Sequence, residues 1–178
     1  MAGVSIDLPP AAAAADAVLV AGLAELVNRV YAVAEEGLWS EDHVRTTTGE
    51  LADGIRDGEI AVARLDGRVV GSVCIRQLDP RTGGFGMLVA APEHRGIGVG
   101  RELVLFAEAL ARSRGLSTMQ LELLVPRAWT HPGKQFLHDW YTRFGYRIVS
   151  TSDFAEAEPV AARHLATPCD YVIYRKDL

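Results

Sequence analysis

Three alternating glycines, Gly96, Gly98 and Gly100, stand directly before a predicted helix over residues 101–114. Glycine reaches backbone conformations closed to other residues, so successive N–H groups of such a turn can point into one concavity. The helix adds free amides and the positive end of its dipole, and an arginine flanks the turn on each side. The segment is therefore suited to a pyrophosphate, although glycines alone are equally typical of a loop without a ligand.

Two nucleotide-binding motifs compete for this segment. A P-loop would need Gly-Lys-Ser/Thr, which the sequence lacks. A dinucleotide-binding fingerprint is closer, because Glu122 lies about 20 residues further on, where an acid that binds ribose would stand. However, the glycine spacing differs, Leu103 takes the place of the third glycine, and too few strands follow. A nucleotide-dependent oxidoreductase is therefore disfavoured.

Length and composition suit one domain over residues 1–178 that needs no disulfide or metal to hold its core. Hydrophobic residues make up 49% and charged residues 23%, which argues against disorder. The formal charge of −5 argues against nucleic-acid binding, and no apolar run approaches the roughly 20 residues that span a membrane. With two cysteines and no basic leader segment, we expect reduced thiols and a cytoplasmic location.

Hydrophobic periodicity predicts an α+β fold around a mixed sheet. Asp16 can cap a long helix, Thr47 and Glu50 have the spacing of a capping box, and Asp66-Gly67 is typical of a hairpin turn. Gly83-Gly84 is interpreted as another turn. We expect helices at residues 16–36, 47–57, 101–114 and 134–144, and strands at residues 4–8, 59–65, 68–77, 85–90, 119–124, 146–151 and 171–175.

The stretch Arg95-Gly96-Ile97-Gly98-Val99-Gly100 matches the pattern Arg/Gln-x-x-Gly-x-Gly/Ala. In this respect the chain resembles the GNAT superfamily of N-acetyltransferases, in which the motif binds the pyrophosphate of acyl-CoA. Residues 85–90 look like the family's central strand, and residues 140–146, Trp-Tyr-Thr-Arg-Phe-Gly-Tyr, resemble its second motif. The resemblance covers residues 59–175 and implies a mixed, mostly antiparallel sheet flanked by about four helices.

The resemblance implies an enzyme, an acetyl-CoA-dependent N-acetyltransferase with acetyl-CoA as cosubstrate and no metal. The acetyl group would pass to a primary amine by direct attack in a ternary complex. A non-catalytic acyl-CoA-binding module on the same fold is the alternative. The expected cofactor-binding residues are Arg95, Gly96, Gly98, Val99, Gly100 and Arg101 at the pyrophosphate, and the backbone amides of Leu88 and Val89 at the thioester oxygen.

Acetyl transfer to an amine needs a base for the ammonium, donors for the thioester oxygen and an acid for the leaving thiolate. Tyr141 matches the family's acid, with a core aromatic as the alternative. The predicted central strand carries no acid or histidine, so our candidate base is Glu122, which alternates with leucines; its alternative is an exposed or salt-bridged strand residue. His131 and Glu36 are weaker candidates, and a water chain could replace a dedicated base.

Three connecting segments, residues 35–43, 125–133 and 151–168, are candidates for the acceptor surface. The acids of the first segment would attract a cationic amine, the alternative being a solvated acidic loop; they are Glu35, Glu36, Glu41 and Asp42. The tentative substrate-binding residues are Glu36, Trp39, Trp129 and His131. The expected partner is an amine of open identity, small molecule or protein, and the sequence leaves a homodimer open.

Overall fold

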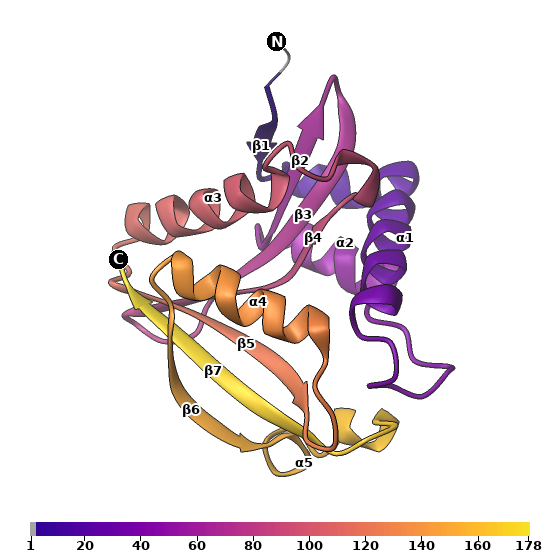
Figure 1. Cartoon of the computed structure of the whole chain (residues 1–178). Helices are drawn as coiled ribbons and strands as arrows, with labels where there is room; N and C mark the ends of the chain where they lie inside the picture. The colour runs from indigo at the N-terminus through magenta and orange to yellow at the C-terminus, as the bar shows by residue number, and fades with distance from the viewer. Residues whose placement is uncertain (1–2) are drawn as a thin grey trace.

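One mixed sheet organises the chain, of which the computed structural model describes residues 3–178 (Figure 1). Its order is β1-β2-β3-β4-β5-β7-β6, and all neighbours are antiparallel except β4 and β5. The strands are β1 (Ser5–Asp7), β2 (Ile60–Leu65), β3 (Arg68–Gln77), β4 (Thr82–Ala90), β5 (Thr118–Pro126), β6 (Arg147–Asp153) and β7 (Cys169–Asp177). The helices are α1 (Ala17–Ala34), α2 (Thr48–Arg56), α3 (Val99–Ser113), α4 (Pro132–Arg143) and α5 (Phe154–Ala157). The predicted α+β class is confirmed, and so is the strand-helix order, except that the short helix α5 between β6 and β7 was not predicted.

The helices α1 and α2 cover one face of the sheet. Asp16 caps α1 by accepting hydrogen bonds from two backbone amides, and Thr47 and Glu50 form the predicted capping box of α2. Leu23 of α1 and Leu51 of α2 pack on β2 and β3. By length and composition α1 is apolar enough to cross a membrane. One stripe of its apolar side chains is buried against the sheet, as in the core helix of a globular domain.

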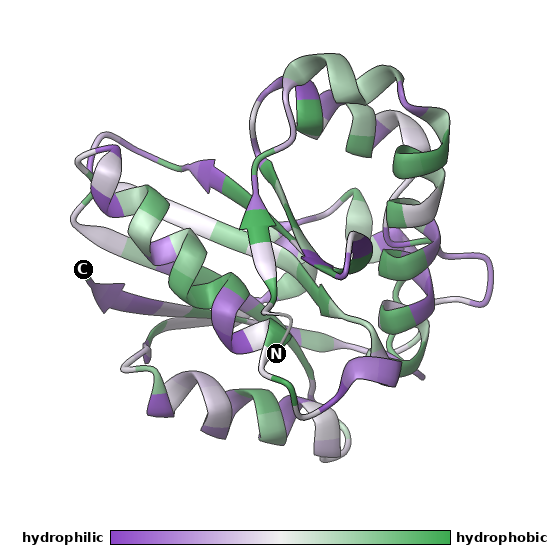
Figure 2. Cartoon of the chain, turned by 90° about the horizontal axis from the view of Figure 1, so that it is seen from above, coloured by the Kyte–Doolittle hydropathy of each residue, from purple (hydrophilic) through white to green (hydrophobic). Residues whose placement is uncertain are grey.

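The helices α3 and α4 cover the opposite face, and Figure 2 shows that the central strands between the two layers are mostly hydrophobic (green). A buried charge connects α3 to β7. Glu108 accepts hydrogen bonds from Lys176 Nζ at 2.8 and 2.9 Å and from Tyr146 Oη at 2.9 Å. Because its partners satisfy this carboxylate, α3 is held over the sheet at a fixed position.

The parallel strands β4 and β5 pair over three residues only, from Thr82–Thr118 to Gly84–Gln120. Beyond that point β4 continues to Ala90 and β5 to Pro126, but the two strands no longer pair with each other. Figure 1 shows the two halves of the sheet diverging there. The β3–β4 register also skips Met87 and Leu88, and Met87 has a φ of +47°. This bulge bends β4 away from β5. We call the unpaired stretch between the two strands, residues 85–90 of β4 and 121–126 of β5, the opening in the sheet.

The interpretation of Gly83-Gly84 as a turn is wrong, because both glycines lie inside β4. At Gly83 a Cβ atom would meet Leu116 at 3.2 Å and Met119 at 3.3 Å. At Gly84 it would meet Leu78 at 2.8 Å. The glycines are therefore needed for close packing within the strand, whereas the true hairpin turn, Asp66-Gly67, has positive φ at both residues as predicted.

Candidate active site

The glycine-rich turn joins the end of β4 to α3. After a 3₁₀ turn over Pro92–His94, Gly96 and Gly98 both have φ of +89°, and Gly98 is the N-cap of α3. No heavy atom lies within 4 Å of a Cβ built on either glycine, so the turn faces open space. Arg95 is exposed at its start, and Arg101 is exposed within the first turn of α3. The free amides of the first helical turn and two cations therefore surround a place suited to an anion.

Gly100 brings this turn close to the opening between β4 and β5. A Cβ on Gly100 would lie 3.5 Å from the Trp140 ring of α4 and 3.8 Å from the side chain of Leu88. The anion-binding turn, the β4 bulge and α4 thus meet at one place. Leu88 and Val89, the residues expected to supply amides to a thioester oxygen, lie at and beside the bulge.

Tyr141 projects from α4 into the aromatic cluster beside this opening. Its ring lies 5.0 Å from Trp140, 5.9 Å from Phe85 and 6.0 Å from Tyr146, between ring centroids. Burial raises the pKa of the Tyr141 phenol well above its usual value, with a smaller contribution from Tyr31. Within residues 3–178 its hydroxyl makes no hydrogen bond, yet it is not among the fully buried polar atoms without a partner. The hydroxyl oxygen therefore borders accessible space and stays protonated.

Glu122 lies on the other face of the sheet. Leu121 and Leu123 belong to the core under α3 and α4, and the alternation of β5 turns Glu122 away from them. Gln120 Nε2 donates to Glu122 Oε1 at 2.6 Å, and Arg175 Nε donates to Gln120 Oε1 at 2.8 Å. This chain of hydrogen bonds orients the half-buried carboxylate. Tyr141 and Glu122 therefore lie on opposite sides of the sheet.

The connection between α1 and α2 lies over the face that carries Glu122. Glu35 is 9% exposed and forms a buried ion pair with Lys134 of α4, with 2.6 Å between Glu35 Oε1 and Lys134 Nζ. Glu35 Oε2 accepts a hydrogen bond from Trp39 Nε1 at 2.6 Å. The expectation that Glu35 attracts a cationic substrate is thus wrong. A buried carboxylate needs a partner of opposite charge, and Lys134 already neutralises the charge of Glu35. Glu36, Glu41 and Asp42 are exposed.

Trp39 helps to line a cavity of about 190 Å³ below this connection. Its ring stacks on His43 with 4.1 Å between centroids. His43 Nε2 is buried without a hydrogen-bond partner within residues 3–178, and burial, His164 and Arg45 lower the pKa of this imidazole. His43 is therefore neutral at pH 7, and it is one of several residues here that the sequence did not single out.

Trp129 and His131 lie at the start of α4. His131 Nδ1 accepts from the amides of Gly133 at 3.1 Å and Lys134 at 3.4 Å, so this side chain caps the helix. Trp129 stacks on His131 and is 3.4 Å from a Cβ built on Gly37. Both aromatic residues line a second cavity of about 580 Å³, which extends from α4 to β6 and β7.

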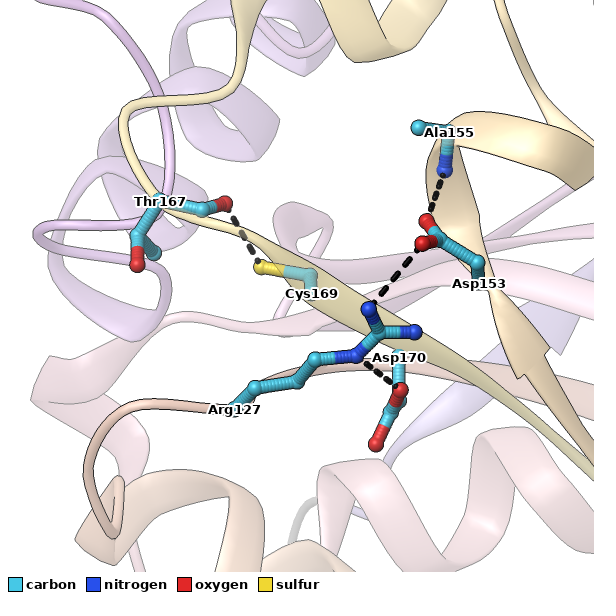
Figure 3. Close-up of polar contacts among 6 residues, drawn as sticks. All are labelled: Arg127, Asp153, Ala155, Thr167, Cys169 and Asp170. Carbon is cyan, nitrogen blue, oxygen red and sulfur yellow. Dashed lines mark hydrogen bonds and ion pairs between the residues drawn. The ribbon is translucent and has the colours of Figure 1, made fainter.

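Arg127 fixes the segment between β5 and α4 (Figure 3). Its Nε donates to Asp170 at 2.5 Å and its Nη1 donates to Asp153 at 3.0 Å. The pKa of Asp153 is lowered first by the backbone N–H of Ala155 and then by Arg127. The guanidinium therefore connects β5, β6 and β7 at the edge of the larger cavity.

The structure separates the predicted residues into two groups. The motif glycines, Leu88 and Trp140 meet at the opening in the sheet, with Tyr141 on one side and Glu122 on the other. Glu36 and Trp39 lie on the α1–α2 connection, which approaches Trp129 at Gly37. Within residues 3–178 no group of three or more His, Cys, Asp or Glu side chains could hold a metal ion.

Comparisons with known proteins agree with this geometry. The model of the acetyltransferase (GNAT) family matches residues 24–146, more than half of the chain, so the protein belongs to that family. An acetyltransferase from Streptococcus agalactiae is similar in structure, with a TM-score of 0.67, 19% identity and 99% of each chain covered. The protein yncA from Salmonella typhimurium, determined with acetyl-CoA, has a TM-score of 0.67 at 16% identity and covers 99% of this chain and 94% of its own.

Rv2747 from Mycobacterium tuberculosis, determined in complex with CoA and NLQ, also has a TM-score of 0.67, with 16% identity. The alignment covers 98% of this chain and 99% of that one. Among curated proteins, no sequence matches significantly. At these identities the structural likeness shows the fold, and the family match shows the class of protein.

Proposed function

We propose that this protein transfers an acetyl group from acetyl-CoA to a primary amine by direct attack in a ternary complex. The observation that carries the proposal is the opening between β4 and β5, which adjoins the anion-binding turn at Gly100 and Leu88. Pyrophosphate bound at that turn would direct the acyl chain towards the opening. The two structural relatives that hold acetyl-CoA or CoA support acetyl-CoA as the cosubstrate.

The two candidate proton-transfer groups suit direct attack. In the proposed reaction the ammonium gives a proton to Glu122, directly or through water, and the free amine attacks the thioester carbon. The amide of Leu88 would stabilise the oxyanion, because the bulge takes Leu88 out of register with β3, whereas Val89 still pairs with Ser72. The C–S bond then breaks, and the CoA thiolate takes a proton from Tyr141. The new amide nitrogen gives up its second proton, which returns to the Tyr141 phenolate through water, and Glu122 releases the first proton to solvent. Glu122 and Tyr141 lie on opposite faces of the sheet. This arrangement fits direct attack, in which the amine approaches the thioester carbon from one side and the thiolate leaves on the other.

The alternative, a non-catalytic acyl-CoA-binding module, is less well supported. Binding alone gives no reason for a phenol that is buried, has a raised pKa and still borders accessible space. We place the reaction in the cytoplasm, a proposal that agrees with the free thiols of Cys74 and Cys169. Release of free CoA thiol from acetyl-CoA in the presence of an amine panel separates an enzyme from a binding module.

The first prediction concerns Gly98→Ala. Alanine at a φ of +89° is strained, so the free energy of unfolding in urea should fall by about 1–2 kcal/mol. Altered N–H directions should also weaken acetyl-CoA binding by about tenfold or more in calorimetric titration. Gly67→Ala is the matched control, because Gly67 has a φ of +77° and open surroundings at a distant hairpin. Equal acetyl-CoA affinity in both folded variants would contradict the assignment of the glycine-rich turn to acetyl-CoA binding.

Tyr141→Phe should lower kcat by about 10²-fold or more and leave acetyl-CoA affinity nearly unchanged. The ring and its aromatic contacts remain, and only the transferable proton is lost. Since burial raises the pKa of Tyr141, the wild-type kcat should not decline up to about pH 10 through loss of this proton. Steady-state kinetics across that range check both points, and a fully active variant would reduce Tyr141 to a core aromatic.

Glu122→Gln should lower kcat/KM while keeping the hydrogen bond with Gln120 available and the strand intact. The measurement is the pH profile of kcat/KM with amines of different pKa. A limb that follows the amine belongs to the substrate, whereas a limb that stays fixed and disappears in Glu122→Gln belongs to the enzyme. Wild-type kcat/KM in the variant for every amine would exclude Glu122 as the base.

A further inference from the structure

The cavity of about 190 Å³ under the α1–α2 connection has an apolar lining and a polar corner. Tyr31, Ala32, Trp39 and Val44 supply the apolar part. Each water molecule in the liquid occupies about 30 Å³, so the cavity has the volume of only a few waters. It suits a small side chain and is too small for a bulky polymer segment. The polar corner is formed by the neutral His43 and the guanidinium of Arg45.

This cavity lies over the opening in the sheet. Tyr31 near the end of α1 packs in one cluster with Val89 and Met87 of β4, and Leu38 of the connection packs with Leu124 of β5. The end of α1 and the connection together therefore cover both parted strands. Leu124 is paired with Tyr171 across β5 and β7, and both pack in one cluster with Leu38 of the connection. Glu122 stands two residues before Leu124 on β5, so it projects from the same face of the sheet. The cavity and the proposed base thus share one face.

The charge of Arg45 is free for a ligand. Within residues 3–178 no carboxylate forms an ion pair with its guanidinium, which lies 4.9 Å from the centroid of the Tyr31 ring. The one carboxylate that lines the cavity, Glu35, has both oxygens occupied and is neutralised by Lys134. The corner therefore carries a net positive charge.

The backbone at Arg45 is also fixed in place. Asn28 Oδ1 accepts from the amides of Arg45 at 2.9 Å and Thr46 at 3.0 Å, and Asn28 Nδ2 donates to the Thr46 carbonyl at 2.9 Å. These three bonds tie the connection to α1. An arginine on a fixed backbone, stacked over an aromatic ring, loses little freedom when it binds an anion.

We propose that the acceptor amine carries a carboxylate that binds Arg45, so that the acceptor is a small amino acid-like molecule with an apolar side chain. The inference rests on the proposed function and names the acceptor class for the same site. Arg45 presents a planar pair of donors to the carboxylate. His43 Nε2 is shielded from the cavity, so the guanidinium of Arg45 alone carries the recognition of the carboxylate. The amino group of the acceptor then faces the side of Glu122.

The test compares matched acceptors by thiol release from acetyl-CoA. The panel holds the common L-amino acids, the amines that lack only their carboxylate, their methyl esters, an O-phosphorylated amine and short peptides. For the preferred apolar amino acid, kcat/KM should exceed that of the decarboxylated amine and of the ester by about 10- to 30-fold. A preference for the phosphorylated amine, the peptides or the decarboxylated amines would overturn the proposal.

Variants then connect this preference to Arg45. Arg45→Gln should lose the advantage of the amino acid but keep the kcat/KM of the decarboxylated amine, a pattern that unfolding cannot produce. Arg45→Lys should recover part of the advantage, because a point charge remains without the bidentate geometry. Arg68→Gln, at the exposed start of β3, is the control and should behave as wild type. An unchanged preference in Arg45→Gln would overturn the proposal.

Calorimetric titration of the acetyl-CoA-loaded protein with the amino acid separates this proposal from the proposed function. Amino acid binding that depends on Arg45, without thiol release from any acceptor, would support the carboxylate site and contradict only the enzymatic role. Thiol release with amines together with no Arg45-dependent binding of amino acids would support the enzymatic role and contradict only the carboxylate site.

Discussion

The separation of β4 from β5 is the feature on which the rest of the site depends. Strand amides inside a protein normally need partners, and loss of a ladder in the middle of a sheet is costly unless something else accepts the hydrogen bonds. Here pairing ends at Gly84 and Gln120, and the bulge at Met87 and Leu88 turns β4 away. A thioester carbonyl that accepts a hydrogen bond from a β4 amide at the bulge would stabilise the bound acyl group. It would also stabilise the parted strands, because it gives that amide a partner.

Charged clusters on three sides hold this opening in shape. Glu108 with Lys176 and Tyr146 ties α3 to β7, Lys134 with Glu35 ties α4 to the end of α1, and Arg127 ties β5 to β6 and β7. Removing one member of a buried pair leaves an uncompensated charge, which typically costs about 3–5 kcal/mol. The pairs of Glu108 and Glu35 are the buried ones and therefore fix the distance between the helices and the strands that border the site, whereas the ion pairs of Arg127 are partly exposed and contribute less.

Local sequence signals predicted much of this architecture. The caps at Asp16 and Thr47, the Asp66-Gly67 hairpin and the motif from Arg95 to Gly100 are short patterns whose physical causes lie within a few residues, and each element was found. The Gly83-Gly84 turn was wrong because the reason for those glycines is a contact with distant side chains. Arg45 and His43 were missed for the same reason: their significance comes from Tyr31, Trp39 and Asn28, and no spacing in the sequence reveals it. The roles of Tyr141 and Glu122 stay predictions.

Amide hydrogen exchange with and without acetyl-CoA tests most directly whether the opening holds the cosubstrate. Exchange should slow at residues 87–88 of the bulge and at residues 96–101 of the turn, because bound thioester and pyrophosphate would accept from those amides. Strand β2, which pairs with β3 from Ile60–Cys74 to Leu65–Arg68 and does not border the opening, should exchange at the same rate in both states. Protection confined to the cavity between α4 and β6, with none at the bulge, would contradict the account.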